Sequence, residues 1–220
     1  MKKSTSAHIL DVALPLFAER PFDAVSTRQI AKQADVNLSA ISYHFGSKEG
    51  LYTAIFERII NDLAPVREGF EQFIEGFIDH LADQPSYQYE FCKQIVELIL
   101  GAVLTHKNSR WNMQLILREV QSHGPNFDLV VEGHVLKMQT MMCQCVGAIM
   151  AEKATSPVVV LTSQSIFNLC LQYSMNQELI RLQLDLSDRE TSAVDLIKSV
   201  SISHICGLLK IPEIENPQNA

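Results

Sequence analysis

Apolar residues recur every three or four positions along most of this chain, which is the spacing of the buried face of an α-helix. In the first segment these residues are Ile9, Leu10, Ala13, Leu14 and Phe17. Pro15 interrupts that segment and removes a hydrogen bond to Asp11, unless the helix begins late enough to tolerate it. Glycine is scarce, with nine in 220 residues, and strand-like alternation is nearly absent. The sequence therefore predicts an all-α fold.

Helix-capping residues divide the first sixty residues into short segments. Ser26 to Gln29 form a capping box, and Asn37 and Ser47 are expected to cap the next two helices. Asp35 stands where the chain needs a left-handed turn. Two helices of about two turns, joined by a three- or four-residue turn, make a helix-turn-helix. A fourth helix follows, and Pro65 is expected to break or kink it.

The rest of the chain predicts longer helices punctuated by proline. Ser156-Pro157 and Ser187 to Glu190 mark helix starts, and the first of these favours a helix over a strand for Val158 to Leu161. The predicted helices span about 66–83, 88–105, 109–122, 127–153, 157–180 and 188–209. We expect a helix-turn-helix DNA-binding domain over 1–63, a larger helical ligand-binding and dimerisation domain over 64–211, and a disordered tail over 212–220.

The charge of the chain is unevenly distributed. The formal net charge is −7, but residues 1–60 hold seven Lys and Arg against six Asp and Glu, whereas the remainder holds eleven against nineteen. A uniformly basic coat is excluded, and the first part alone is suited to a polyanion. The sequence shows neither an export signal nor a span of eighteen uncharged apolar residues, so we expect no membrane partner. Five dispersed cysteines indicate reduced thiols in a cytoplasmic protein.

Catalytic and metal motifs are not found in the sequence. Cys143 and Cys145 are two residues apart, which places their thiols on roughly opposite sides of a helix. Neither Cys-x-x-Cys, His-x-x-x-His, a glycine-rich phosphate loop nor Gly-x-Ser-x-Gly occurs. We therefore expect no enzyme activity, no cofactor and no metal. A thiol redox switch stays open, although the cysteines lack an adjoining basic residue that favours the thiolate.

The second helix of a helix-turn-helix reads duplex DNA because it fits the major groove. On the predicted helix 38–45 the core needs Ile41 and Phe45, four residues apart. Arg28 is the one long donor near the reading edge and a candidate for a bidentate guanine contact. A capped bundle with merely solvated surface residues explains the same pattern nearly as well. The residues left facing outward are Leu38, Ser39, Ala40, Ser42, Tyr43 and His44.

The run from Ser26 to Val36, followed by the run from Tyr43 to Tyr52, closely resembles the DNA-binding domain of TetR-family transcriptional regulators. The resemblance implies a homodimer on a pseudo-palindromic double-stranded operator, controlled by a small-molecule effector. The sequence departs from the family at Pro21, Asp35 and Ser42, and the family often has tyrosine in the place of Ser42. By position, the resemblance implies phosphate contacts from Thr27, His44 and Lys48, and base or groove contacts from Arg28, Leu38, Ser39, Ala40, Ser42 and Tyr43.

The later part of the chain is similar to the TetR regulators with a CecR-like C-terminal domain. The similarity lies in the run from Leu117 to Glu119, in Gly124 to Asp128 and in Ser165 to Cys170. It implies that helices 157–180 and 188–209 pair with their symmetry mates. Packing inside one subunit explains many of their apolar residues, but not all. These residues are Val158, Leu161, Ile166, Leu169, Tyr173, Val194, Ile197, Val200, Ile205 and Leu208.

A methionine-rich stretch is the leading candidate for the wall of an effector pocket. Its members are Met138, Met141, Met142, Cys145 and Met150, and flexible thioethers suit apolar guests of different shapes. Methionines that fill an irregular core are the alternative at each position. On the preceding helix, Trp111, Gln114 and Arg118 recur at a helical spacing and face the same way. Arg118 is equally suited to a structural ion pair.

Together these observations predict a cytoplasmic, ligand-responsive, dimeric DNA-binding regulator, with repression as the expected mode. An activator or architectural protein of the same fold, without small-molecule input, is one alternative. A helical enzyme or carrier with a vestigial DNA domain is the other.

Overall fold

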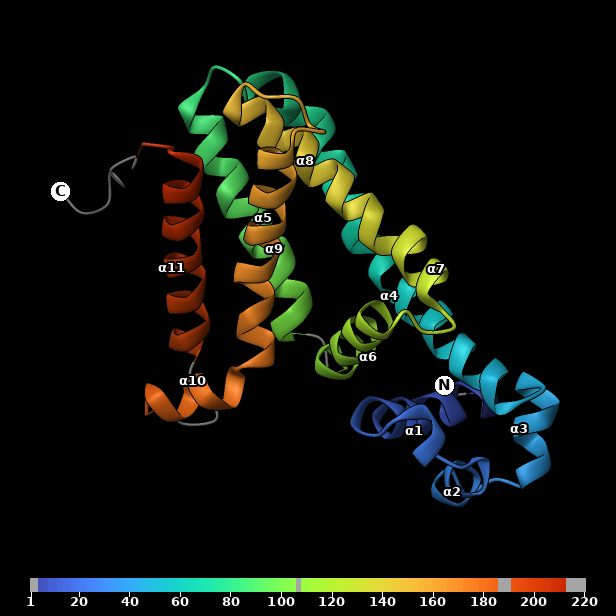
Figure 1. The fold of residues 1–220 in the computed structure, drawn as a ribbon. Helices are drawn as coiled ribbons and strands as arrows, with labels where there is room; N and C mark the ends of the chain where they lie inside the picture. Colours follow the sequence, from blue (N-terminus) through green and yellow to red (C-terminus); the bar gives the residue numbers. More distant parts are fainter. Residues whose placement is uncertain (1–3, 106–107, 186–190, 213–220) are drawn as a thin grey trace. The chain divides into compact units, whose positions relative to one another are not determined.

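The computed structural model describes residues 4–105, 108–185 and 191–212 of the protein, and these residues form helices and turns without a strand. They divide into two compact units (Figure 1). The first contains Met1–Pro65 and Lys107–Val135, and the second contains Val66–His106 and Leu136–Ala220. The predicted all-α class is confirmed.

The first unit is built around a single apolar core. Its elements are α1 (Thr5–Glu19), the 3-10 turn η1 (Phe22–Ala24), α2 (Thr27–Gln33), α3 (Leu38–Phe45), the first part of α4 (Lys48–Phe77), α6 (Ser109–Ser122), α7 (Phe127–Val130) and the π-helical turn η3 (Val131–Val135). The core takes residues from α1, α2, α3, α4, α6 and α7. The fully buried large side chains at its centre are Ile9, Leu14, Phe17, Ile30, Ile41, Leu51, Ile55, Phe56 and Ile59.

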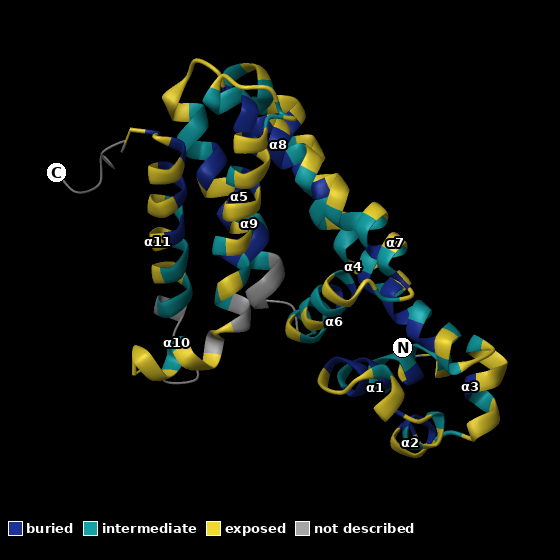
Figure 2. Cartoon of the chain, viewed as in Figure 1, coloured by how far each residue is buried: buried dark blue, intermediate teal, exposed yellow. Residues whose placement is uncertain are grey.

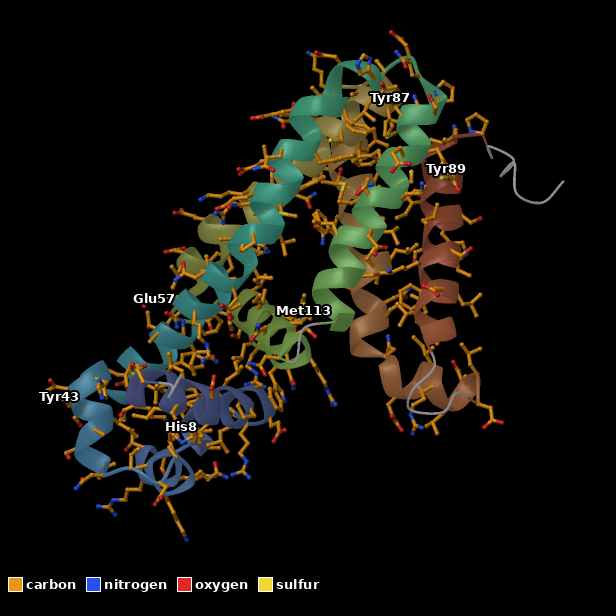
Figure 3. All side chains as sticks on the ribbon, turned by 180° about the vertical axis from the view of Figure 1, so that it is seen from behind. His8, Tyr43, Glu57, Tyr87, Tyr89 and Met113 are labelled. Carbon is orange, nitrogen blue, oxygen red and sulfur yellow. The ribbon has the colours of Figure 1, made fainter. Side chains whose placement is uncertain are left out.

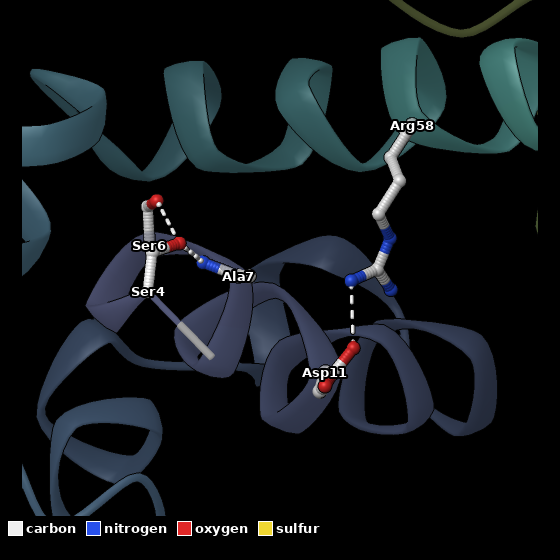
Figure 4. A network of polar contacts seen from close by, with 5 residues as sticks. All are labelled: Ser4, Ser6, Ala7, Asp11 and Arg58. Carbon is white, nitrogen blue, oxygen red and sulfur yellow. Dashed lines mark hydrogen bonds and ion pairs between the residues drawn. The ribbon is translucent and has the colours of Figure 1, made fainter. Parts of the chain in front are cut away.

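Two polar contacts fix α1 in this unit. The Ser4 hydroxyl accepts a hydrogen bond from the backbone N–H of Ala7 at 3.2 Å and begins the helix. Farther along, Arg58 of α4 donates to the Asp11 carboxylate at 2.8 Å (Figure 4). Because α1 begins at Thr5, Pro15 lies well inside the helix, so the late start that its position would favour does not occur.

Helix α4 runs through Pro65 and ends at Phe77, so of the break or kink predicted at this proline the break is wrong. A proline inside a helix costs about 3 kcal/mol relative to alanine. Burial on both sides offsets this cost: Phe56 and Ile59 are buried in the first unit, and Phe70 and Ile74 in the second. The expected helix 66–83 is therefore the end of α4 followed by the 3-10 turn η2 (Ile78–His80).

The second unit packs the end of α4 and η2 with α5 (Pro85–Thr105), α8 (Leu136–Met150), α9 (Pro157–Met175), α10 (Gln177–Gln183) and α11 (Thr191–Leu209). Helix α9 contacts α8, α5, α10 and α11, and α11 also contacts α5 (Figure 1). Val158 to Leu161 lie in α9, as predicted, with Pro157 at its first position. The predicted capping box at 187–190, and residues 213–220 of the tail predicted to be disordered over 212–220, lie outside the described residues.

The second half of the chain departs from the expected organisation in two places. The predicted helix 127–153 consists of α7, the π-helical turn η3 and α8. Residues 107–135 pack with the first unit because α6 lies against α1, although the sequence places everything after residue 64 in one domain. Among the described residues, none of the helices combines the length and the apolarity that spanning a membrane requires.

Candidate nucleic-acid interface

The turn between α2 and α3 sets the orientation of the helix predicted to read DNA. Asp35 adopts a left-handed conformation with φ of 51°. The backbone N–H of Val36 donates to the Ala31 carbonyl at 3.0 Å, which gives a carbonyl at the end of α2 a hydrogen-bond partner beyond the helix. From α1, the His8 ring donates a hydrogen bond from Nε2 to the Ala34 carbonyl at 3.1 Å. The predicted turn at Asp35 is confirmed, and the contribution of His8 was not evident from the sequence.

Both ends of α3 are fixed by local contacts. Asn37 accepts a hydrogen bond from the Ser39 backbone N–H at 3.1 Å. Gly46 follows the helix with φ of 75°, a conformation that side chains disfavour. At Gly50 a Cβ atom would lie 2.0 Å from the Phe45 carbonyl oxygen, so this close approach requires glycine. The Ser47 hydroxyl then caps α4 by accepting from the Gly50 N–H at 3.1 Å.

Helix α3 buries one side and presents the other to solvent. Ile41 is buried and Phe45 packs partly against the core, as predicted. Tyr43 is 85% exposed and lies on the outer side of the helix (Figure 3). Ala40 also packs partly against the core, so it is less available than its neighbours. The exposed members of the predicted contact set on this helix are Leu38, Ser39, Ser42, Tyr43 and His44.

Two basic residues border this surface. Arg28 is exposed near the start of α2, beside the half-buried Thr27. Lys48, the first residue of α4, is half-buried, and its ammonium nitrogen lies 4.1 Å from the centroid of the Phe22 ring. The Ser26 hydroxyl caps α2 by accepting from the Gln29 N–H at 3.1 Å. These caps give the bordering residues a defined backbone beside α3.

Helix α6 packs against α1 and bonds to its C-terminal end. Arg118 donates to the Phe17 carbonyl at 2.6 Å and to the Arg20 carbonyl at 2.9 Å, and it also reaches the Ala18 carbonyl. The sequence placed Arg118 at a pocket wall or in an ion pair, whereas the structure directs it to the carbonyl end of α1. The reason is that the last carbonyls of a helix lack partners within it and attract a cation.

Glu119, the next residue, is 2% exposed and forms a second contact from α6. It accepts a hydrogen bond from the Tyr52 hydroxyl at 3.3 Å and another from the Asn126 backbone N–H. Burial, with Glu119 nearby, raises the pKa of Tyr52 above its usual value, so this hydroxyl keeps its proton. Thr53 donates to the Asn126 side chain at 2.8 Å and extends the contact along α4.

The predicted pocket residues fall into two sets in different units. On α6, in the first unit, Trp111 packs partly against the core and Gln114 is exposed. On α8, in the second unit, Met138, Met142 and Cys145 are buried, and Met141 is partly buried. The methionines thus include core residues, which is the alternative that the sequence left open.

Burial disfavours thiolate chemistry in the second unit. All five cysteines are free and buried. Burial raises the pKa of Cys145 and of Cys170 to about 12. The pKa of Cys92 is also raised, mainly by a hydrogen bond with Cys206 and next by burial. Thiolates are the reactive form, so these thiols are poor nucleophiles. Among the residues that the structure describes, no three His, Cys, Asp or Glu side chains are grouped to hold a metal ion.

The two helices predicted to pair between subunits carry both buried and exposed apolar residues. Ile166 and Ile205 are fully buried, so they belong to the core of one subunit. Exposed residues follow the outer side of α11 (Figure 2). The exposed apolar residues of the two helices are Val158, Val160 and Leu161 of α9 and Leu196, Val200 and Leu208 of α11.

The known proteins that this chain is similar to are transcriptional regulators. Residues 9–55 match the family model of bacterial regulatory proteins of the tetR family, and residues 88–208 match that of the C-terminal domain of the HTH-type transcriptional dual regulator CecR. CecR of Shigella flexneri is 28% identical over 203 residues, 90% of this chain and 87% of CecR. YttP of Bacillus subtilis is 31% identical over 120 residues, so the match spans about half of each protein, 54% of this chain and 52% of YttP. A transcriptional regulator from Aquifex aeolicus VF5 shares the fold, with a TM-score of 0.54 at 18% identity, covering 92% of this chain and 98% of that one.

Proposed function

The chain belongs to the TetR family of transcriptional regulators, with a C-terminal domain of the CecR type, and we propose from this premise that it is a cytoplasmic repressor. It binds a pseudo-palindromic operator as a homodimer and releases it when a small, largely apolar effector binds. The observation that carries the proposal is α3, which is capped at both ends and presents exposed hydrogen-bonding side chains.

In this proposal α3 enters the major groove and reads base edges. Ser39, Ser42 and Tyr43 offer hydroxyl groups, and Leu38 an apolar contact for a thymine methyl group. Thr27, His44 and Lys48 bind the flanking phosphates, which supply most of the affinity without specifying sequence. Two subunits place two copies of α3 in successive grooves, about 34 Å apart.

The proposed dimer uses the exposed apolar residues of α9 and α11. Leu161 is 67% exposed and Leu196 is 52% exposed, which is costly for large aliphatic side chains that remain in water. In a two-fold interface the same patch meets itself, so each residue contributes twice. The effector then acts by population shift, because it stabilises an arrangement in which the two helix-turn-helix domains of the dimer no longer match the half-sites.

The proposal is tested by titrating the protein onto DNA from upstream of its own gene. We expect a saturable, sequence-dependent gel shift and a symmetric pair of protected half-sites. Absence of a specific shift favours the enzyme or carrier alternative. Quenching of Trp111 by members of a ligand library, together with loss of the shift, identifies effectors. If no ligand changes the shift, the activator or architectural alternative is favoured.

Arg28→Ala is expected to weaken operator binding by about 1–3 kcal/mol and to relax discrimination at one base pair, because Arg28 is proposed to make a bidentate guanine contact. Competition gel shifts with operators substituted at single positions measure both effects. Arg28→Lys is the control, since it keeps the charge and loses the planar fork. Arg28→Lys should therefore keep its affinity for random DNA while losing the same discrimination. An equal loss on random DNA for Arg28→Ala contradicts base reading.

Lys48→Ala is expected to weaken binding to every sequence, because a phosphate contact is independent of the bases. The slope of log affinity against log salt concentration should fall by about 0.9 for the lost contact. Lys137→Ala, at an exposed position of α8, is the control for the general effect of removing a positive charge. An unchanged slope for Lys48→Ala rules out the phosphate contact.

A further inference from the structure

The ammonium group of Lys48 rests against an aromatic ring. Its nitrogen lies 4.1 Å from the centroid of Phe22, well within the range of a cation–π interaction. The neighbouring acid, Glu49, has a lowered pKa, caused first by a hydrogen bond from its own backbone N–H, next by one from Ser47, and last by the charge of Lys48. The Phe22 ring is thus a close partner of the Lys48 side chain and limits its positions.

Ring packing and a backbone hydrogen bond both hold Phe22 in place. It lies in the three-residue turn η1, which ends with a backbone hydrogen bond from Val25 to the Phe22 carbonyl at 3.2 Å. The Phe22 ring stacks on the Phe17 ring, with 5.8 Å between the ring centroids and an interplanar angle of 13°. The Phe22 ring also contacts the Tyr52 ring in a tilted arrangement, with 5.0 Å between the ring centroids. These three rings form an aromatic group between α1, η1 and α4.

The aromatic group is in turn fastened to α6. Tyr52 is 4% exposed, and its hydroxyl donates to the buried Glu119. Arg118 donates to the backbone carbonyl of Phe17, so both residues whose rings flank Phe22 are hydrogen-bonded to α6, Tyr52 through its hydroxyl and Phe17 through its backbone. A buried polar network with satisfied partners rigidifies the groups that it joins. The Phe22 ring, which lies against Lys48, therefore packs on two residues that are themselves hydrogen-bonded to α6.

We propose that Phe22 is a positioning residue for DNA binding: held by Tyr52 and Phe17, it orients the Lys48 ammonium before DNA arrives. The inference rests on the proposed function, in which Lys48 contacts a phosphate. The ring occupies one side of the ammonium and leaves its remaining N–H donors for a phosphate oxygen. A lysine already confined in this way loses less rotamer freedom on binding.

The test uses a mixed-sequence duplex of about 30 base pairs, because phosphate contacts need no operator. Phe22→Leu is expected to weaken binding about two- to fivefold, because a Lys48 side chain that is no longer confined loses more rotamer freedom when it binds a phosphate. Phe22→Tyr keeps an electron-rich ring face and should restore most of the affinity. In a Lys48→Ala background, Phe22→Leu should have no further effect, because the group that it positions is gone.

The outcomes separate the inference from the proposed function. If the wild-type protein shows no salt-dependent binding, or Lys48→Ala leaves the salt slope unchanged, the phosphate role of Lys48 fails. If Lys48→Ala lowers the slope but Phe22→Leu binds like wild type, the positioning role fails. Equal losses from Phe22→Leu with and without Lys48 also refute it, since they indicate a purely structural effect. Should Phe22→Leu not fold, pentafluorophenylalanine at position 22 retains the ring shape, reverses its electrostatics and should weaken binding similarly.

Discussion

Arg118→Ala is expected to destabilise the first compact unit by about 2–3 kcal/mol. The guanidinium of Arg118 donates to the backbone carbonyls of Phe17, Ala18 and Arg20. These carbonyls end α1 and have no partners farther along the helix. Hydrogen bonds from a charged donor contribute more than neutral ones, and a cation at a helix C-terminus adds a favourable dipole interaction. Alanine removes all of these contributions at once.

Urea unfolding followed by the fluorescence of Trp111 measures this effect. Trp111 is the single tryptophan of the chain and packs against the core of the first unit, so its signal reports that unit. Arg110→Ala is the matched control, because Arg110 lies on the same helix and is exposed. We expect the control to change stability by less than about 0.5 kcal/mol. If both variants unfold at the same urea concentration, the bonds to α1 do not stabilise the unit.

The helix-turn-helix was predictable because its signals are local. Ser26, Asn37 and Ser47 accept hydrogen bonds from backbone N–H groups two or three residues ahead, and these short distances are readable in the sequence. Asp35 in the left-handed region is equally local, since the turn requires that conformation at that residue. The exposed side of α3 then follows from the burial of Ile41.

The supports of the proposed site were not predictable, because they join distant parts of the chain. Arg118 reaches carbonyls about a hundred positions earlier, at separations of 98 to 101 residues. Glu119 bonds to Tyr52 across 67 residues, and Lys48 meets the ring of Phe22 in a preceding turn. Helical periodicity indicates which face of a helix is apolar, but not which helix covers it. The packing of α6 in the first unit is hidden for the same reason.

Two features of the helices show how packing overrides local preference. Pro65 disfavours a helix locally, yet α4 continues through it because residues on both sides are buried. The π-helical turn η3 contains Gly133, where a Cβ atom would lie 3.3 Å from Ile60 of α4. This close approach belongs to the pairing of η3 with α4, and a glycine in the sequence does not reveal its partner.

Leu161→Glu is expected to weaken self-association about a thousandfold. Leu161 is 67% exposed on α9, so the fold of one subunit does not depend on burying it. In the proposed two-fold interface it is buried twice, and burying a leucine side chain contributes about 1.5–3 kcal/mol. The substitution loses both contributions and brings two carboxylates toward an apolar surface, which adds a desolvation cost. Two contributions of about 2 kcal/mol each correspond to this thousandfold loss.

Sedimentation equilibrium measures the association, with Leu182→Glu as the matched control. Leu182 lies on α10, outside the proposed interface. Its side chain is 65% exposed, nearly the same exposed fraction as that of Leu161. We expect Leu182→Glu to remain dimeric and Leu161→Glu to dissociate while keeping its helical circular dichroism. The two helix-turn-helix domains of the dimer must occupy two half-sites. Leu161→Glu should therefore weaken binding to the operator more than it weakens binding to random DNA. If Leu161→Glu stays dimeric, or both variants dissociate alike, the subunits do not pair through this part of α9.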